Sequence, residues 1–166
     1  MIRSIPGFPS PGIIFRDITT MLKDPAGLNM AVDAIAESLS GIDFDIVIGP
    51  ESRGFIFGVP LAYKMNKGFV PARKAGKLPA ETARKAYALE YGEAVIEIHR
   101  DAILPGSRVV LVDDLLATGG TAKAAADLVT ELGAKIVGMT FLIELAALGG
   151  REILKGYDNV KSVLIY

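Results

Sequence analysis

The chain has 166 residues, of which 51% are hydrophobic and 22% are charged. This length predicts a single domain, residues 1–166, with enough apolar residues for a substantial core. The formal net charge is only −1, so the chain lacks the basic surplus of nucleic-acid-binding proteins, and we expect no nucleic-acid partner. The absence of cysteine excludes disulfides, thiolate catalysis and cysteine-based metal sites.

The mean hydropathy of +0.39 is high for a chain without a membrane segment. The apolar runs at residues 109–112 and 136–143 each end at an acidic residue, well short of the ~18 apolar residues of a membrane-spanning helix. We therefore expect no membrane partner, and the apolarity instead predicts strands that are buried on both faces. The N-terminus contains several prolines and no apolar signal segment, so we expect a cytoplasmic protein.

The first part of the chain predicts a turn-rich start followed by a helix. Prolines and glycines make residues 5–12 a succession of turns, and a short apolar segment follows at 13–15. Asp24 before Pro25 is typical of a helix start. Apolar residues at helical spacing then continue until Gly41, where we expect the helix to end.

The middle of the chain predicts two strands, a helix between them and a long polar excursion. Residues 45–50 predict a buried strand that ends in a loop, and residues 69–72 predict a short strand. Residues 54–67 have a helical pattern, but Pro60 implies either a late start or a kink. Residues 76–92 are polar and have no clean helical period, so we expect a mobile segment folded as a loose hairpin.

Strands and helices alternate in the last part of the chain. The predicted elements are, in order, a strand at 94–99, a strand at 108–112, a helix between Gly120 and Gly133, a strand at 136–143, a short helix at 149–155 and a strand at 162–165. This alternation, without repeats or a linker, predicts a doubly wound α/β domain with a mainly parallel sheet flanked by helices.

Polar residues of types that bind ligands follow the predicted strand at 108–112. Asp113 and Asp114 come first, and residues 117–121 then open the next helix with two glycines and two threonines. Ligands of open α/β sheets bind beyond the carboxyl ends of strands. Backbone N–H groups at a glycine-rich helix start bind anions, and threonine hydroxyls add donors. The loop at 117–121 therefore predicts a phosphate site.

The two acids suit a different part of a ligand. Carboxylates accept hydrogen bonds from hydroxyls or coordinate hard divalent cations, and a phosphate beside vicinal hydroxyls describes a ribose 5-phosphate. The alternative is that Asp113 and Asp114 only cap the following helix, while the glycines only turn the chain. The chain lacks both the Gly-Lys-Ser/Thr loop of nucleotide triphosphatases and the Gly-x-Gly-x-x-Gly fingerprint of dinucleotide-binding domains.

Five blocks of the chain, in the same order, resemble one protein family. They are Phe-Arg-Asp-Ile-Thr at 15–19, Ser-Arg-Gly-Phe at 52–55, Arg-Lys-Ala-Gly-Lys-Leu-Pro at 73–79, Leu-Glu-Tyr-Gly at 89–92 and Asp-Asp-Leu-Leu-Ala-Thr-Gly-Gly-Thr at 113–121. The last block resembles the phosphoribosyl pyrophosphate (PRPP) motif of type I phosphoribosyltransferases. Its residue sequence is similar to that of the adenine-specific branch of this family. The five blocks lie within residues 6–150.

The resemblance implies an enzyme of purine salvage. Its reaction is adenine plus PRPP giving AMP plus pyrophosphate, with Mg²⁺ as cofactor, in a homodimer of the type I phosphoribosyltransferase fold. Within the single domain, it implies a small hood at residues 1–24 that binds the base and a flexible lid at 76–92. Two alternatives are phosphoribosyl transfer to another 6-substituted purine and a catalytically silent PRPP-binding regulator. Such regulators have an added DNA-binding domain, for which this chain has neither the length nor the charge.

The resemblance assigns roles to the residues around the PRPP motif. The 5-phosphate is held by Ala117, Thr118, Gly119, Gly120 and Thr121. Asp113 and Asp114 hold the ribose hydroxyls and offset positive charge that develops at C1. No direct protein ligand to the metal is implied, because Mg²⁺ arrives with PRPP and lies near these two acids.

A second group is assigned to the leaving pyrophosphate. Its members are Glu51, Ser52, Arg53, Arg73, Lys74 and Lys77. The resemblance implies a non-proline cis peptide between Glu51 and Ser52. It also makes Arg53 a catalytic residue whose guanidinium donates two hydrogen bonds to a phosphate. The alternatives are a surface salt bridge for Arg53 and a solvated basic face for the cations at 73–77.

The last assignments concern the base and its proton. Adenine-binding residues are Ile14, Phe15, Arg16 and Leu115: the side chains of Phe15 and Leu115 sandwich the purine, and backbone groups of the other two contact its edge. From the residues alone, Phe15 is instead a core side chain. Glu90 is the second catalytic residue, exchanging a proton with the base when the lid closes, or else an exposed hairpin glutamate. His99, the one histidine, has no partner at any motif spacing, and we expect it to be non-catalytic.

Overall fold

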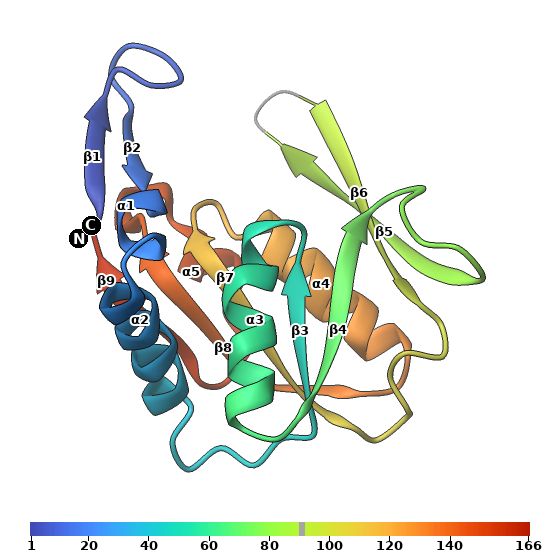
Figure 1. Cartoon of the computed structure of the whole chain (residues 1–166). Helices are drawn as coiled ribbons and strands as arrows, with labels where there is room; N and C mark the ends of the chain where they lie inside the picture. The colour runs from blue at the N-terminus through green and yellow to red at the C-terminus, as the bar shows by residue number, and fades with distance from the viewer. Residues whose placement is uncertain (90–91) are drawn as a thin grey trace. The chain divides into compact units, whose positions relative to one another are not determined.

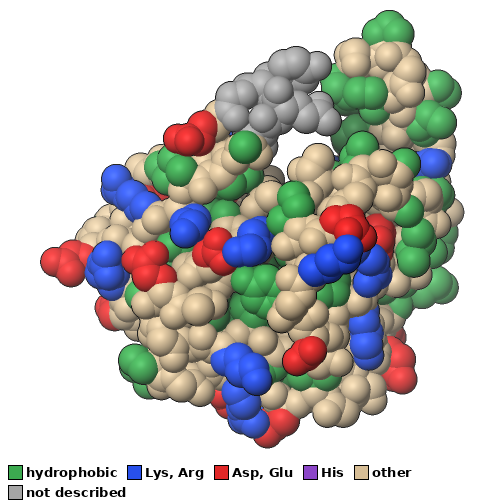
Figure 2. Space-filling model, turned by 180° about the vertical axis from the view of Figure 1, so that it is seen from behind, with side chains coloured by type: hydrophobic (Ala, Val, Ile, Leu, Met, Phe, Trp, Pro, Cys, Tyr) green, Lys and Arg blue, Asp and Glu red, His purple; other side chains and the backbone are tan. Residues whose placement is uncertain are grey.

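The computed structural model describes residues 1–89 and 92–166. The described residues form two compact units, residues 1–34 and 35–166. No helix of the described residues is long and apolar enough to cross a membrane. On the face shown in Figure 2, acidic and basic side chains are interspersed, in keeping with a net charge near zero.

The first unit contains a two-stranded antiparallel sheet and the start of a long helix (Figure 1). Strand β1, Arg3–Pro6, pairs with β2, Ile14–Asp17, and the Arg3 Nε donates to Asp17 Oδ2 at 3.0 Å. Helix α1 spans Thr19–Leu22 and α2 spans Pro25–Ser38. The predicted helix start is confirmed, because Asp24 Oδ1 accepts the N–H of Ala26 at 3.1 Å. Strand β1 was not predicted.

A seven-stranded sheet forms the centre of the second unit (Figure 1). Its strands are β3 (Ile46–Pro50), β4 (Gly68–Lys74), β5 (Thr82–Leu89), β6 (Gly92–His99), β7 (Arg108–Leu116), β8 (Lys135–Glu144) and β9 (Val160–Ile165). They lie in the order β5-β6-β4-β3-β7-β8-β9. The five strands from β4 to β9 in this order are parallel, whereas β6 runs antiparallel to both of its neighbours. The predicted mainly parallel sheet is confirmed.

Helices pack on both faces of this sheet. Helix α3, Arg53–Lys64, covers one face and α4, Gly120–Glu131, covers the other (Figure 1). A 3₁₀ turn, Ala146–Leu148, precedes the short helix α5, Gly150–Ile153. Strands β3 and β7 lie between the two helix layers, so Val47, Val110 and Leu111 are completely buried, as their apolar runs predicted.

Two sequence expectations need correction. Helix α3 begins at Arg53 and continues past Pro60, so a late helix start is wrong; Pro60 lies inside the helix, where it removes one N–H donor. The excursion at 76–92 does contain a hairpin arm, but the arm is not loose, because β5 pairs residue by residue with β6. Strand β5 lies at the edge of the sheet, where charged side chains are normal, and this explains its polar sequence.

Candidate active site

A pocket of about 220 Å³ lies beyond the carboxyl ends of β3 and β7. Residues 51–53 line it directly after β3, residues 113–122 line it from the end of β7 to the start of α4, and Tyr87 of β5 completes the lining. Strands β3 and β7 are parallel neighbours, so their carboxyl ends meet at one sheet edge. The structure thus brings together the residues that sequence analysis assigned to phosphate, ribose and part of the pyrophosphate.

The loop at 117–121 presents the start of α4 to this pocket. Gly119 adopts a left-handed conformation with φ of +84°, and no side chain of the described residues caps the helix after it. The first N–H groups of a helix have no partner inside the helix, so they are available to an anion. The backbone of Gly150 supports the loop from behind, because a Cβ added there would lie 2.3 Å from the Ala117 carbonyl oxygen.

The paired acids have unequal surroundings. Asp114 is 3% exposed, and its Oδ2 lies 3.1 Å from the Arg53 Nε, whereas Asp113 is half-buried and its Oδ1 accepts the Asp114 N–H at 2.8 Å. Burial raises the pKa of Asp113, and the neighbouring Asp114 carboxylate raises it further. Burial also raises the pKa of Asp114, but the Arg53 guanidinium opposes this shift. These acids are costly to ionise without a ligand, so hydroxyl donors or a cation would stabilise them.

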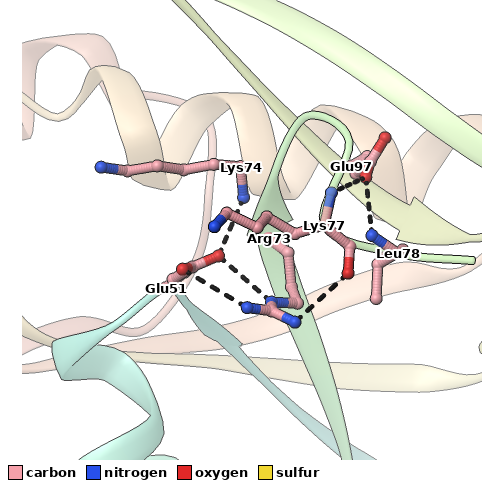
Figure 3. A network of polar contacts seen from close by, with 6 residues as sticks. All are labelled: Glu51, Arg73, Lys74, Lys77, Leu78 and Glu97. Atoms are coloured by element: carbon pink, nitrogen blue, oxygen red, sulfur yellow. Dashed lines mark hydrogen bonds and ion pairs between the residues drawn. The ribbon is translucent and has the colours of Figure 1, made fainter.

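A second polar network lies beside the pocket and is drawn in Figure 3. The Arg73 Nε donates to Glu51 Oε2 at 3.1 Å, the Lys74 N–H donates to the same oxygen at 3.2 Å, and a further Arg73 nitrogen donates to the Lys77 carbonyl oxygen at 3.3 Å. The Arg73 guanidinium is the largest cause that lowers the pKa of Glu51, with the Lys74 N–H and the Lys77 ammonium adding to it against burial. Glu51 therefore orients cations, and the Glu51–Ser52 peptide is cis, as the resemblance implied.

Comparison with known proteins identifies the family. Residues 19–164 match the phosphoribosyl transferase domain. The chain is 58% identical over 165 residues to the adenine phosphoribosyltransferase of Lachnoclostridium phytofermentans, covering 99% of this chain and 94% of that one. The chain belongs to the adenine phosphoribosyltransferase branch of the phosphoribosyltransferase family. The expected family is confirmed.

Solved structures of adenine phosphoribosyltransferases have the same fold. The enzyme from Thermoanaerobacter pseudethanolicus matches with a TM-score of 0.97 at 53% identity, covering 100% of this chain and 96% of that one. The enzyme from Saccharomyces cerevisiae, solved with adenine and an imino-altritol bisphosphate, matches with a TM-score of 0.91 at 41% identity, covering 98% and 94%. The expected type I phosphoribosyltransferase fold is therefore confirmed.

The residues that the resemblance assigned to adenine fall in both units. In the first unit, Phe15 is half-buried and packs edge-to-face on Phe8, with ring centroids 5.3 Å apart, and Arg16 donates to the Ser4 hydroxyl across the β1–β2 ladder. Ile14 is exposed on the same strand. In the second unit, Leu115 lines the pocket.

Glu90 and His99 are the other residues of this phosphoribosyltransferase that the sequence singled out. Glu90 lies outside the described residues. His99 does have a partner, because its Nε2 donates to the Pro79 carbonyl oxygen at 2.6 Å, but it does not line the pocket. Sequence reasoning missed Tyr87, which lines the pocket from β5. The polar sequence of β5 has no apolar pattern, so it did not predict the regular pairing of this strand with β6. A Cβ added at Gly120 would lie 3.4 Å from the Tyr87 ring, so this tyrosine borders the phosphate loop.

Proposed function

We propose that the chain transfers the 5-phosphoribosyl group of PRPP to adenine, giving AMP and pyrophosphate in purine salvage. The observation that supports this most is one pocket of about 220 Å³ in which a helix start suited to phosphate, the paired acids Asp113 and Asp114, and Arg53 lie together. Membership of the adenine phosphoribosyltransferase branch supplies the reaction. Because the substrate is a multiply charged phosphate ester that does not cross membranes, we also propose a cytoplasmic location.

Each part of PRPP has a matching group in the pocket. The 5-phosphate binds the N–H groups and hydroxyls of residues 117–121, and the ribose hydroxyls donate to Asp113 and Asp114. When the bond from C1 to pyrophosphate breaks, positive charge develops on the ribose. Ionised carboxylates in a pocket from which water is partly excluded stabilise that charge more than water does, because the local dielectric constant is low.

The leaving pyrophosphate needs cations. Arg53 is partly exposed and lines the pocket, so it can release Asp114 and fork onto a phosphate as the ribose hydroxyls take its place. Arg73, Lys74 and Lys77 add positive charge next to Ser52, and Glu51 holds this group in place. Neutralising the departing anion lowers the barrier to its departure.

The base and its proton involve residues that the pocket alone does not define. We propose that Phe15 and Leu115 sandwich adenine, while backbone groups of Ile14 and Arg16 contact its edge. As N9 of adenine bonds to C1 and the bond from C1 to pyrophosphate breaks, Glu90 accepts the proton that the purine ring loses, and it returns this proton in the reverse reaction. Residues 1–24 act as the hood, and residues 76–92 act as a lid that excludes water, which would otherwise hydrolyse PRPP.

Mg²⁺ is the cofactor that this site fits. Asp113 and Asp114 supply hard oxygen atoms, and Mg²⁺ prefers one or two carboxylates together with water and substrate phosphates. No group of three or more acidic or histidine side chains is gathered among residues 1–89 and 92–166 to hold a metal alone. We propose that the metal arrives with PRPP and lies near Asp113 and Asp114, where it would neutralise charge on the pyrophosphate.

We also propose a homodimer. Val59 and Tyr63 lie one turn apart on α3, and their exposed fractions are 48% and 89%. Two large apolar side chains on one helix face are more stable when a second copy covers them. Light scattering at micromolar concentration tests this, and a monomer would contradict it.

One assay tests the reaction itself. The protein is mixed with PRPP and Mg²⁺ and, separately, with adenine, hypoxanthine, guanine or xanthine, and the nucleotide formed is measured. We expect AMP from adenine and little product from the other bases. Product from another purine would instead favour a different specificity, and PRPP binding without any product would favour the silent regulator.

A further inference from the structure

Glu97 is a fully buried carboxylate that the proposed reaction does not use. It lies on β6 with an exposed fraction of 0%. In the antiparallel ladders it stands opposite Arg73 on β4 and opposite Arg84 on β5. Directly opposed residues share one face of a sheet, so Glu97 lies between two arginines on that face.

The polar contacts of the Glu97 carboxylate that the structure gives go to the β4–β5 connection and to the start of β5. Its Oε1 accepts the N–H groups of Lys77 and Leu78, each at 3.1 Å. Its Oε2 accepts the Thr82 hydroxyl at 3.3 Å and lies 2.9 Å from the Arg84 Nε. The carboxylate therefore holds both ends of the turn that connects β4 to β5.

Lys77 is fixed at both sides of its backbone. Its N–H donates to Glu97, and its carbonyl oxygen accepts from Arg73, which in turn donates to Glu51 (Figure 3). Figure 3 shows the Lys74 and Lys77 side chains extending on the Glu51 side of this network, away from Glu97. Because the backbone is fixed, the Lys77 side chain starts from a defined point on the Glu51 side of this network.

A neutral side chain cannot replace this carboxylate. Burying an anion is costly unless several donors satisfy it, and here two backbone N–H groups, a hydroxyl and a guanidinium do so. Burial acts to raise the pKa of Glu97, but these donors outweigh it and lower the pKa overall. An amide at this position would keep one acceptor oxygen and would turn N–H donors toward Arg84 and Thr82.

We propose that Glu97 is a positioning residue for the pyrophosphate half of the substrate: it fixes the turn at 75–81 so that Arg73 and Lys77 are placed before pyrophosphate binds. This inference rests on the proposed function, in which these cations bind the leaving group. Pre-placed cations bind an anion more tightly because less conformational freedom is lost on binding. Glu97 itself does not touch the substrate.

The test compares Glu97→Gln with Glu93→Gln, a matched change of an exposed glutamate on the same strand. Pyrophosphate and AMP are used as separate probes of the two halves of the site. In Glu97→Gln we expect the inhibition constant of pyrophosphate and the KM of PRPP to rise about tenfold, while the Kd of AMP changes less than twofold. Glu93→Gln should match the wild type in all three.

A purely structural role predicts a different pattern. If Glu97→Gln weakened AMP and pyrophosphate equally, or lowered only the melting temperature, the positioning role would be overturned. An unchanged inhibition constant of pyrophosphate in Lys77→Ala would overturn it as well. Failure of the proposed function is a separate result, since then the wild type forms no AMP from adenine and PRPP.

A second variant keeps the inference testable if Glu97→Gln does not fold. Thr82→Val with Arg84→Ala removes both partners of Oε2 and leaves the two backbone N–H contacts of Oε1 in place. We expect a smaller effect in the same direction, a rise of about threefold for pyrophosphate with AMP unchanged. Equal binding of pyrophosphate by this variant and the wild type would count against the inference.

Discussion

The Arg53 guanidinium and the buried Asp114 carboxylate neutralise each other in the ligand-free pocket, with 3.1 Å between Nε and Oδ2. Asp114 is nearly inaccessible to solvent, whereas the Arg53 side chain is 41% exposed. The pair therefore consists of a buried carboxylate and a more accessible guanidinium cation. A substrate with hydroxyls for the acid and phosphates for the arginine can exchange this one ion pair for two favourable interactions.

Removing Arg53 should change the pH dependence of the reaction. The guanidinium lowers the pKa of Asp114 against burial, so in Arg53→Gln this pKa rises and the acid stays protonated to higher pH. If ionised Asp114 is needed, the acid limb of kcat/KM moves to higher pH, and kcat/KM falls at least about tenfold at neutral pH. A pH profile of kcat/KM checks this, with the exposed Arg100→Gln as control. An acid limb that does not move would contradict the pairing argument.

Asp113→Asn should stabilise the protein while it abolishes turnover. Burial raises the pKa of Asp113 above its ordinary value of 3.8, so the folded state binds a proton more tightly than the unfolded chain does. Such a group destabilises the fold increasingly as the pH rises above 3.8. The asparagine keeps the oxygen that accepts the Asp114 N–H and removes this penalty.

Thermal unfolding at two pH values measures this effect. At pH 7 the melting temperature of Asp113→Asn should exceed that of the wild type by a few degrees, about 2–4 °C for each kcal/mol. Well below pH 3.8 the difference should vanish, because wild-type Asp113 is then protonated in both the folded and the unfolded chain. A variant that is less stable than the wild type at pH 7 would show that the carboxylate is not strained in the free protein.

Gly150→Ala should damage the phosphate loop although residue 150 does not line the pocket. A Cβ at this position would lie 2.3 Å from the Ala117 carbonyl oxygen, and backbone must move to relieve that contact. We expect the KM of PRPP to rise about tenfold or more, since small displacements of positioned groups have effects of this order or larger. Steady-state kinetics measure it. Gly68→Ala is the control, because its nearest neighbour is 4.0 Å away, and it should leave the KM within twofold.

His99→Ala should leave catalysis nearly intact. The imidazole donates to the Pro79 carbonyl oxygen and does not line the pocket, so its loss removes one hydrogen bond, worth about 1 kcal/mol of stability. We expect turnover within a few-fold of the wild type and a slightly lower melting temperature. Complete loss of activity would mean that the site extends to β6 in a way that contradicts our assignments.

The fold and the phosphate loop were predictable because local patterns determine them. Buried parallel strands need continuous apolar runs, and the runs around Val47 and Val110 gave their positions. The loop at 117–121 was predictable for a related reason, since a helix start with paired glycines after a buried strand has few other uses. The acids at the end of β7 came with it.

The remaining features depend on contacts between distant residues. Nothing in the sequence near Glu97 predicts that it is buried, because its partners among residues 1–89 and 92–166 come from the β4–β5 connection and from β5. Glu51 was expected to contact pyrophosphate, and only the pairing of β3 with β4 brings it to Arg73. The regular pairing of β5 with β6 was not predictable for the same reason, because the ladder needs only backbone hydrogen bonds and leaves no apolar pattern in the sequence.

The glycine-rich start of α4 has a consequence for how this protein responds to salt. Peptide N–H groups attract a phosphate through dipoles that add nothing to the net charge, so a chain with a formal charge of −1 can still bind a polyanion. Mobile ions screen partly exposed ammonium and guanidinium groups strongly, but they screen dipoles inside a pocket much less. The two ends of one substrate are thus held by forces of different ionic-strength dependence, and rising salt should loosen the pyrophosphate end before the 5-phosphate end.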